Sequence, residues 1–162
     1  MSIRRTTVAT FLFLAAFVAA AEPAPVPSVS FFVSARRAVR NLSEGDLRRI
    51  FLGEISRWPD GHRIVLYVRP FDSAVGRLFL DRLVRMSDID YSQWWLGVVF
   101  RGRAAAAPRV IHSSEAMARD VAANADAIGF DSSLAPMLDS DVVVITVDNR
   151  GPGDPRYSIR SH

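Results

Sequence analysis

The sequence contains no cysteine and no lysine, and only three of its 162 residues are histidine. Without cysteine the chain can form neither a disulfide nor a zinc site built on thiolates, so a hydrophobic core must hold its fold together. His62 follows a turn glycine, His112 ends a short apolar segment and His162 is the last residue. None of these positions indicates a Ser-His-Asp nucleophile or a metal-ligand spacing. The sequence therefore predicts no enzyme, no metal and no cofactor.

The first 21 residues have the pattern of a secretory signal peptide. Arg4 and Arg5 precede an apolar run at residues 8–21, which is shorter than the ~20 residues that span a membrane. Alanines stand before the expected cleavage point. We expect cleavage after Ala21, with an uncleaved anchor as the alternative. The mature protein should then lie in the periplasm or be secreted, without a stable membrane span.

The charge of the chain does not indicate a nucleic-acid partner. All 20 basic residues are arginine, and there are 17 acidic residues. Removal of Arg4 and Arg5 with the signal peptide leaves 18 basic residues, 20 minus 2. The mature chain is therefore close to neutral. Its arginines alternate with carboxylates and form no stripe that could follow a phosphate backbone.

Without the signal peptide 141 residues remain, 162 minus 21, which suits one domain. We assign residues 22–28 to a Pro-rich linker, 29–148 to the domain and 149–162 to a C-terminal tail. Apolar, β-prone segments predict strands at residues 29–33, 64–68, 110–111, 127–130 and 142–147. Their alternation with helices predicts an α/β domain whose mixed sheet is covered by helices on both faces.

Capping residues mark where the predicted helices begin. Ser43 should start a short helix that stops at Gly53, and Ser113 or Ser114 should start another. Asp90 is expected to cap a third helix.

The clearest helix follows Ser73. Its apolar residues share one helical face, namely Val75, Leu78, Phe79, Leu83 and Met86. This spacing predicts a single helix from residue 73 to residue 86.

The passage from the strand at 64–68 into this helix is the one arrangement suited to an anion. If Ser73 is the N-cap, the next backbone N–H groups lack helical acceptors and point along the positive end of the helix dipole. Arg69, at the strand end, would add a guanidinium that can bind an oxyanion through two parallel bonds. Asp72 would repel a dianion but would accept a hydrogen bond from a protonated one. Two alternatives stay open: Ser73 only caps its helix, and Arg69 only pairs with Asp72.

Several motifs follow one another in an order that is found in a known family. They are residues 42–53 (LSEGDLRRIFLG), then Trp58, Arg69, Ser73 and Phe79, and then residues 127–130 (AIGF). In this order and spacing the chain resembles the phosphate-type periplasmic solute-binding proteins of ABC transporters over residues 29–148.

The resemblance implies two α/β lobes that close on an oxyanion, with no metal and no catalysed reaction. Arg69 matches the family's ligand arginine, and Ser73 matches the serine of its Ser-Gly-Thr turn. Ala74 and Val75 stand at the glycine and threonine of that turn, so one hydroxyl donor is missing. Phe71 replaces the family's aspartate. The candidate ligand-binding residues are Arg69, Asp72, Ser73, Ala74 and Val75.

The matched region corresponds to one lobe, which the full-length proteins carry in the middle of their sequence. On this resemblance, the Gly/Ser-rich first lobe, which supplies the opposing half of the family's pocket, is expected to be missing. We therefore expect a single-lobe version with half a site, completed by a homodimer or a protein partner. The leading hypothesis is an exported solute-binding-like protein for a small oxyanion such as phosphate, serving an ABC transporter. The alternative is an envelope interaction or sensing module on the same fold, with a vestigial ligand site.

Overall fold

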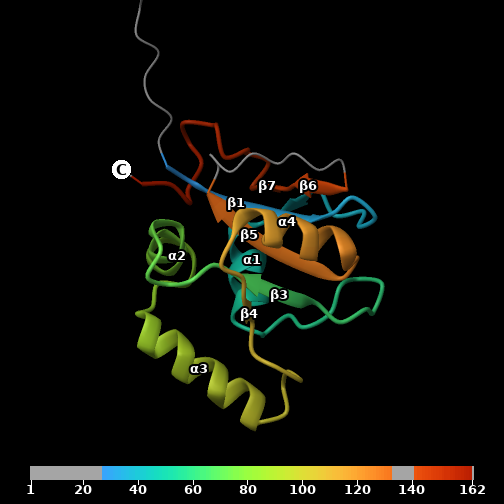
Figure 1. Ribbon diagram of the computed structural model, residues 1–162, viewed down its shortest axis with the longest axis vertical. Helices are drawn as coiled ribbons and strands as arrows, with labels where there is room; N and C mark the ends of the chain where they lie inside the picture. Colours follow the sequence, from blue (N-terminus) through green and yellow to red (C-terminus); the bar gives the residue numbers. More distant parts are fainter. Residues whose placement is uncertain (1–26, 133–140, 162) are drawn as a thin grey trace, which may run out of the picture.

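The computed structural model describes residues 27–132 and 141–161, so the predicted signal peptide and most of the predicted linker lie outside the described residues. A mixed sheet with strand order β4-β3-β5-β1-β6 forms the centre of the protein (Figure 1). Its strands are β1 (Val29–Ser34), β3 (Val65–Val68), β4 (Arg109–Val110), β5 (Ala127–Ser132) and β6 (Val142–Val144). Strands β3, β4 and β5 run parallel, whereas β1 is antiparallel to both β5 and β6.

Helices cover both faces of this sheet. They are α1 (Glu44–Phe51), α2 (Ala74–Phe79), the π-helical segment η1 (Leu80–Val84), α3 (Asp88–Phe100) and α4 (Ser114–Ala123). Helix α4 lies on one face of β1 and β5, α1 lies behind the sheet, and α3 projects away from it (Figure 1). A short parallel pair joins β2 (Asn41–Leu42) to β7 (Thr146–Val147). The predicted α/β class with a mixed sheet is confirmed.

Side chains of the central strands alternate between two cores, because successive residues of a strand point to opposite faces. Phe31 and Phe130 belong to the core on the side of α1 and α2, whereas Phe32 packs with Met117 of α4. Gly129 makes room for α4, since a Cβ at this position would lie 2.8 Å from the Met117 sulfur. Strand β5 is thus buried on both faces, which explains its nearly continuous apolar sequence.

Most predicted helix starts are confirmed. The hydroxyls of Ser43, Ser73 and Ser113 each accept a hydrogen bond from the amide three residues later. The prediction that Asp90 caps α3 is wrong, because Ser87 takes this position and accepts from the Asp90 amide at 3.1 Å. The Ser87 hydroxyl also donates to the Asp90 carboxylate at 2.7 Å, so two hydrogen bonds join these residues.

The single helix predicted from residue 73 to residue 86 is divided in two. Helix α2 ends at Phe79, and the wider turn of η1 follows, closed by a hydrogen bond of 2.6 Å from the Arg85 amide to the Leu80 carbonyl. Arg85 then adopts a left-handed conformation, with φ 57°, which ends the helix. A π-helical turn contains about one residue more than an α-helical turn, and this changes the spacing of apolar residues very little. The hydrophobic pattern of the sequence therefore could not separate the two segments.

The last predicted strand is also divided, and the chain beyond it returns to the sheet. Ile145 is buried between β6 and β7. Farther on, Tyr157 and Ile159 are buried as well. The Tyr157 hydroxyl donates to the Val29 carbonyl at 2.8 Å, and the Val29 amide donates to the Ile159 carbonyl at 2.9 Å. Residues after β7 therefore complete the core beside the start of β1.

Arg37, which follows β1, joins the turn at residues 58–61 to the residue directly before β5. Its guanidinium forms ion pairs with Asp60 and Asp126 and lies 5.3 Å from the centroid of the Trp58 ring. Only 8% of Arg37 is exposed. Desolvation raises the pKa of Asp60, but the His62 amide and Arg37 together lower it by more, so the pKa lies below its ordinary value of 3.8.

We expect Arg37→Ala to lower the free energy of unfolding near neutral pH, because it leaves two carboxylates without their partner. A carboxyl group with a lowered folded pKa stabilises the fold above its unfolded pKa and loses this contribution as the pH falls through the folded value. The difference between variant and parent should therefore shrink in acid. Urea unfolding at about pH 7 and about pH 3 measures it. An equal difference at both pH values would contradict the assignment.

Candidate functional site

Arg69 follows β3 and is held where the three parallel strands end. Its Nη1 donates to the Ile111 carbonyl at 3.1 Å, and its Nε lies 3.6 Å from Oδ1 of Asp131. Asp131 belongs to β5, and Ile111 directly follows β4. The side chains of Arg69 and Asp131 are only 13% and 4% exposed. In sheets of this kind, ligands bind outside the carboxyl ends of the parallel strands.

The pair of Arg69 and Asp131 is incompletely bonded. The buried Nε of Arg69 and the buried Oδ2 of Asp131 have no hydrogen-bond partner among the described residues. Nη2 of Arg69 makes no hydrogen bond to a described residue either. Buried polar atoms without partners cost free energy and are rare in native proteins, so each calls for an explanation. Together they provide donors and an acceptor side by side.

Ser73 uses both hydrogen-bonding functions of its hydroxyl within the loop. Oγ donates to the Pro70 carbonyl at 2.5 Å and accepts from the Gly76 amide at 3.0 Å. The expected cap is therefore present, but the hydroxyl has no donor left for a ligand. The amides of Ala74 and Val75 make no hydrogen bond to another described residue, as is usual in the first turn of a helix.

Asp72 is exposed and does not pair with Arg69. Its backbone carbonyl accepts a hydrogen bond from Arg77, and its carboxylate forms no ion pair or hydrogen bond within the described residues. The alternative in which Arg69 only pairs with Asp72 is therefore wrong, because Asp131 provides the carboxylate. No ion pair or hydrogen bond between described residues joins Arg69 to residues 72–75. The structure brings Arg69 to β5 and to the segment after β4.

Asp131 is the site residue that the sequence interpretation missed. One signal was available: an aspartate directly follows the buried segment at residues 127–130. Parallel pairing of β5 with β3 places this aspartate at the same edge as Arg69. The sequence does not reveal which strands are neighbours, so this signal could not be interpreted without the sheet order.

Residues 27–132 and 141–161 contain neither a metal centre nor a membrane-spanning helix. No group of three or more histidine or acidic side chains in this part of the chain is arranged to hold a metal ion. No helix within it combines the length and the apolar character needed to cross a membrane.

Comparisons with known proteins give matches in fold. No protein-family model matches the chain, and no curated protein matches it in sequence. An ABC-type phosphate transport receptor from Vibrio cholerae is 21% identical with a TM-score of 0.65, over 84% of this chain and 55% of the receptor. PstS from Borrelia burgdorferi is 16% identical with a TM-score of 0.67, over 85% and 56%.

A third structure, from Clostridium perfringens, is described as a phosphate ABC transporter substrate-binding protein with bound phosphate. It is 18% identical with a TM-score of 0.59, over 76% of this chain and 46% of that structure. The chain thus spans about half the length of these structures. It has the α/β fold of the phosphate-type solute-binding proteins over the part of them that it matches.

Proposed function

We propose that this chain is an exported solute-binding-like protein that binds a small protonated oxyanion, such as hydrogen phosphate, beside Arg69. The observation that carries the proposal is the Arg69–Asp131 pair at the carboxyl ends of β3 and β5, in which Nη2 of Arg69 and Oδ2 of Asp131 have no hydrogen-bond partner among the described residues. The fold supports it, because the matching structures are named as phosphate receptors.

The chemistry of the pair suits an anion that still carries a proton. The guanidinium of Arg69 would donate to oxygens of the anion through Nη2, and the carboxylate of Asp131 would accept the proton of the ligand. Sulfate carries no proton at neutral pH, so one of its negatively charged oxygens would lie against the carboxylate of Asp131 and be repelled by it. The site should therefore prefer phosphate to sulfate. In this proposal, the amides of Ala74 and Val75 add donors, and Asp72 is a second acceptor.

The length of the chain has a consequence for affinity. Since the chain spans about half of the receptors it matches, we propose that a second copy or a partner protein supplies the remaining donors. Each missing charge-assisted hydrogen bond costs about 1.5–3 kcal/mol. One copy alone should bind weakly. In this proposal the protein works in the periplasm and passes the anion to an ABC transporter.

Isothermal titration of the purified protein with phosphate, sulfate and acetate tests this function. We expect phosphate to release or absorb heat on binding and sulfate to give a smaller signal. Arg69→Ala should bind phosphate at least tenfold more weakly, because one charge-assisted hydrogen bond accounts for about a factor of ten in affinity. Arg119→Ala is the matched control, since Arg119 on α4 has a 74% exposed side chain. Sedimentation with and without phosphate shows whether the anion promotes a dimer.

Two outcomes would contradict the oxyanion proposal. One is the same heat from Arg69→Ala as from the parent protein. The other is no heat with any of the three anions, at protein concentrations where the dimer is populated as well as where it is not.

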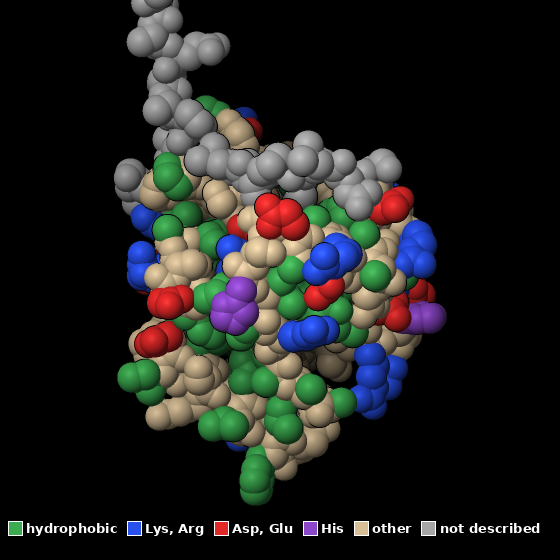
Figure 2. Space-filling model, in the orientation of Figure 1, with side chains coloured by type: hydrophobic (Ala, Val, Ile, Leu, Met, Phe, Trp, Pro, Cys, Tyr) green, Lys and Arg blue, Asp and Glu red, His purple; other side chains and the backbone are tan. Residues whose placement is uncertain are grey.

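An interaction module remains the second candidate, because of the apolar surface of α3. The side chains of Ile89, Leu96 and Phe100 are 64%, 70% and 96% exposed. Figure 2 shows hydrophobic side chains at the end of the molecule that α3 occupies. Contiguous exposed apolar residues often mark a protein contact. This candidate would be favoured if no anion gave heat in the titration and the protein also showed stable self-association or a co-purified protein partner.

A further inference from the structure

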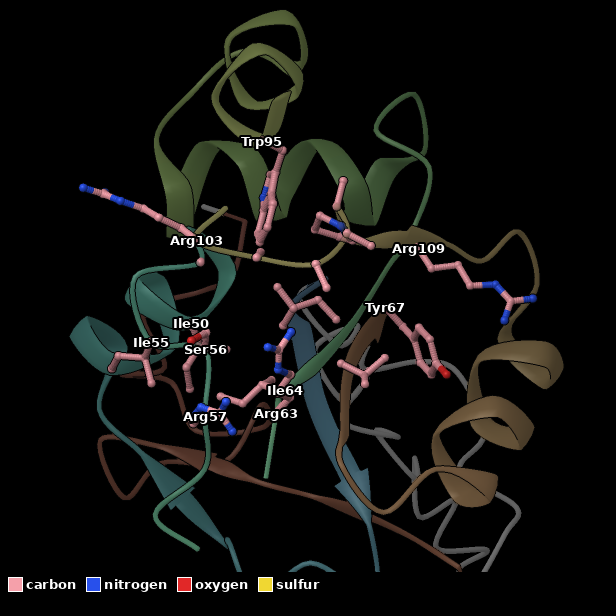
Figure 3. Close-up of a pocket in the computed structure, with 18 of the residues that line it drawn as sticks. Ile50, Ile55, Ser56, Arg57, Arg63, Ile64, Tyr67, Trp95, Arg103 and Arg109 are labelled. Atoms are coloured by element: carbon pink, nitrogen blue, oxygen red, sulfur yellow. The ribbon is translucent and has the colours of Figure 1, made fainter. Parts of the chain in front are cut away.

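A cavity of about 590 Å³ lies beside β3, and neither Arg69 nor Asp131 lines it. It opens between the chain after α1, strand β3 and the connection from α3 to β4 (Figure 3). This volume is in the range of pockets that hold small organic molecules.

The floor of the cavity is apolar. Ile50, Leu66 and Trp95 line it and are 3%, 9% and 4% exposed. The indole Nε1 of Trp95 already donates to the Phe51 carbonyl at 3.1 Å, so the ring presents only apolar atoms to the cavity. Alanines 104–107 form the facing wall with small side chains. An alkyl chain or an aromatic ring would bury its surface here at the expense of water.

The rim of the cavity is positively charged. Arg57, Arg63, Arg103 and Arg109 line it, and no acidic residue is among its lining residues. No ion pair joins any of these four arginines to a carboxylate in the part of the chain that the structure describes. In a chain that is nearly neutral overall, this is an uncompensated concentration of charge.

Two of these arginines are placed opposite each other. Arg57 and Arg63 form an isolated antiparallel bridge across the turn at residues 58–61. In Figure 3 both are drawn below Arg103 and Arg109, which extend outward to either side. Like charges directly opposite across paired strands destabilise each other. An anion between the two guanidinium groups would remove this repulsion.

The turn that carries these arginines is held firmly. Arg57 donates to the Gly61 carbonyl at 2.6 Å, Arg37 pairs with Asp60, and the Trp58 indole donates to the Asp126 carbonyl at 3.0 Å. A backbone held in this way loses little further entropy when a ligand binds beside it.

We propose that this cavity binds a single-chain carboxylate, with the carboxylate between Arg57 and Arg63 and the apolar part against Leu66 and Trp95. The planar guanidinium groups match a carboxylate in geometry, and the apolar floor favours anions that carry a hydrophobic part. The site uses none of the residues proposed for the oxyanion.

Isothermal titration with decanoate, acetate and decanol separates the two requirements. We expect decanoate to bind, and the other two probes to bind at least tenfold more weakly, because acetate lacks the chain and decanol lacks the charge. The double variant Arg57→Gln/Arg63→Gln should also lose at least tenfold in decanoate affinity. Both residues are exposed, so this variant should fold. A matched control is Arg119→Gln/Arg156→Gln, whose side chains are 74% and 75% exposed.

Arg69→Ala distinguishes this site from the oxyanion site. Decanoate should bind to Arg69→Ala as it does to the parent protein, and excess phosphate should not displace it. Equal binding of decanol, unchanged affinity in the double variant, or loss of decanoate binding in Arg69→Ala would each overturn the proposal.

Discussion

Phe130→Ala is expected to lower the free energy of unfolding by about 3–5 kcal/mol, the range for removing a fully buried aromatic side chain. Phe130 is 0% exposed, and its ring stacks on Phe79 with 4.2 Å between centroids. It also contacts Phe31 and Phe51, at 6.0 and 5.9 Å between centroids. The truncation therefore opens a cavity where β1, β5, α1 and α2 meet.

Urea unfolding of Phe130→Ala and of Phe100→Ala provides the measurement and its control. Phe100 is 96% exposed, so its truncation should change the stability by less than about 0.5 kcal/mol. The double variant Phe79→Ala/Phe130→Ala should lose less than the sum of the single losses, because the two rings share one contact. Equal effects of Phe130→Ala and Phe100→Ala would contradict the described packing.

Gly76→Ala is expected to cost about 3 kcal/mol of stability and to weaken phosphate binding. A Cβ at this position would lie 2.1 Å from the Pro70 carbonyl oxygen and 2.9 Å from Cα of Phe71. Both are backbone atoms, so no side-chain rotation can relieve the overlap. The loop that follows Arg69 would have to separate from α2, and the Ser73 cap would be lost with it.

Gly45→Ala is the matched control for this substitution. Gly45 is an exposed residue of α1, and its added Cβ would come no closer than 3.9 Å to Ser43 Oγ. Alanine in a helix is favoured over glycine by about 0.5–1 kcal/mol, so this variant should be unchanged or slightly more stable. If Gly76→Ala unfolds at the same urea concentration as the parent, the close approach of Pro70 to α2 does not exist in solution.

Local chemistry decided how well the sequence predicted each element. The caps at Ser43, Ser73 and Ser113 depend on a hydroxyl and an amide only three residues apart, so they could be predicted from the sequence. The same spacing joins Ser87 to Asp90, and the sequence interpretation assigned the cap to the wrong end of this pair.

Features that depend on the order of strands in the sheet could not be predicted from the sequence. Arg69 was identified by its place after a strand, but its partner Asp131 is far away in sequence and becomes a neighbour only through the pairing of β3 with β5. The cavity beside β3 has the same origin, because its floor combines α1, β3 and Trp95 of α3. Composition predicted a nearly neutral chain and so gave no sign of the local excess of arginine.

The position of β1 in the sheet delays folding during synthesis. Strand β1 is made early, but both of its neighbours, β5 and β6, and the Ile159 segment bonded to Val29 come from the last part of the chain. Until those residues leave the ribosome, Phe31 and Phe32 have no sheet to join. The centre of the sheet should therefore assemble only after β5, β6 and Ile159 have been synthesised.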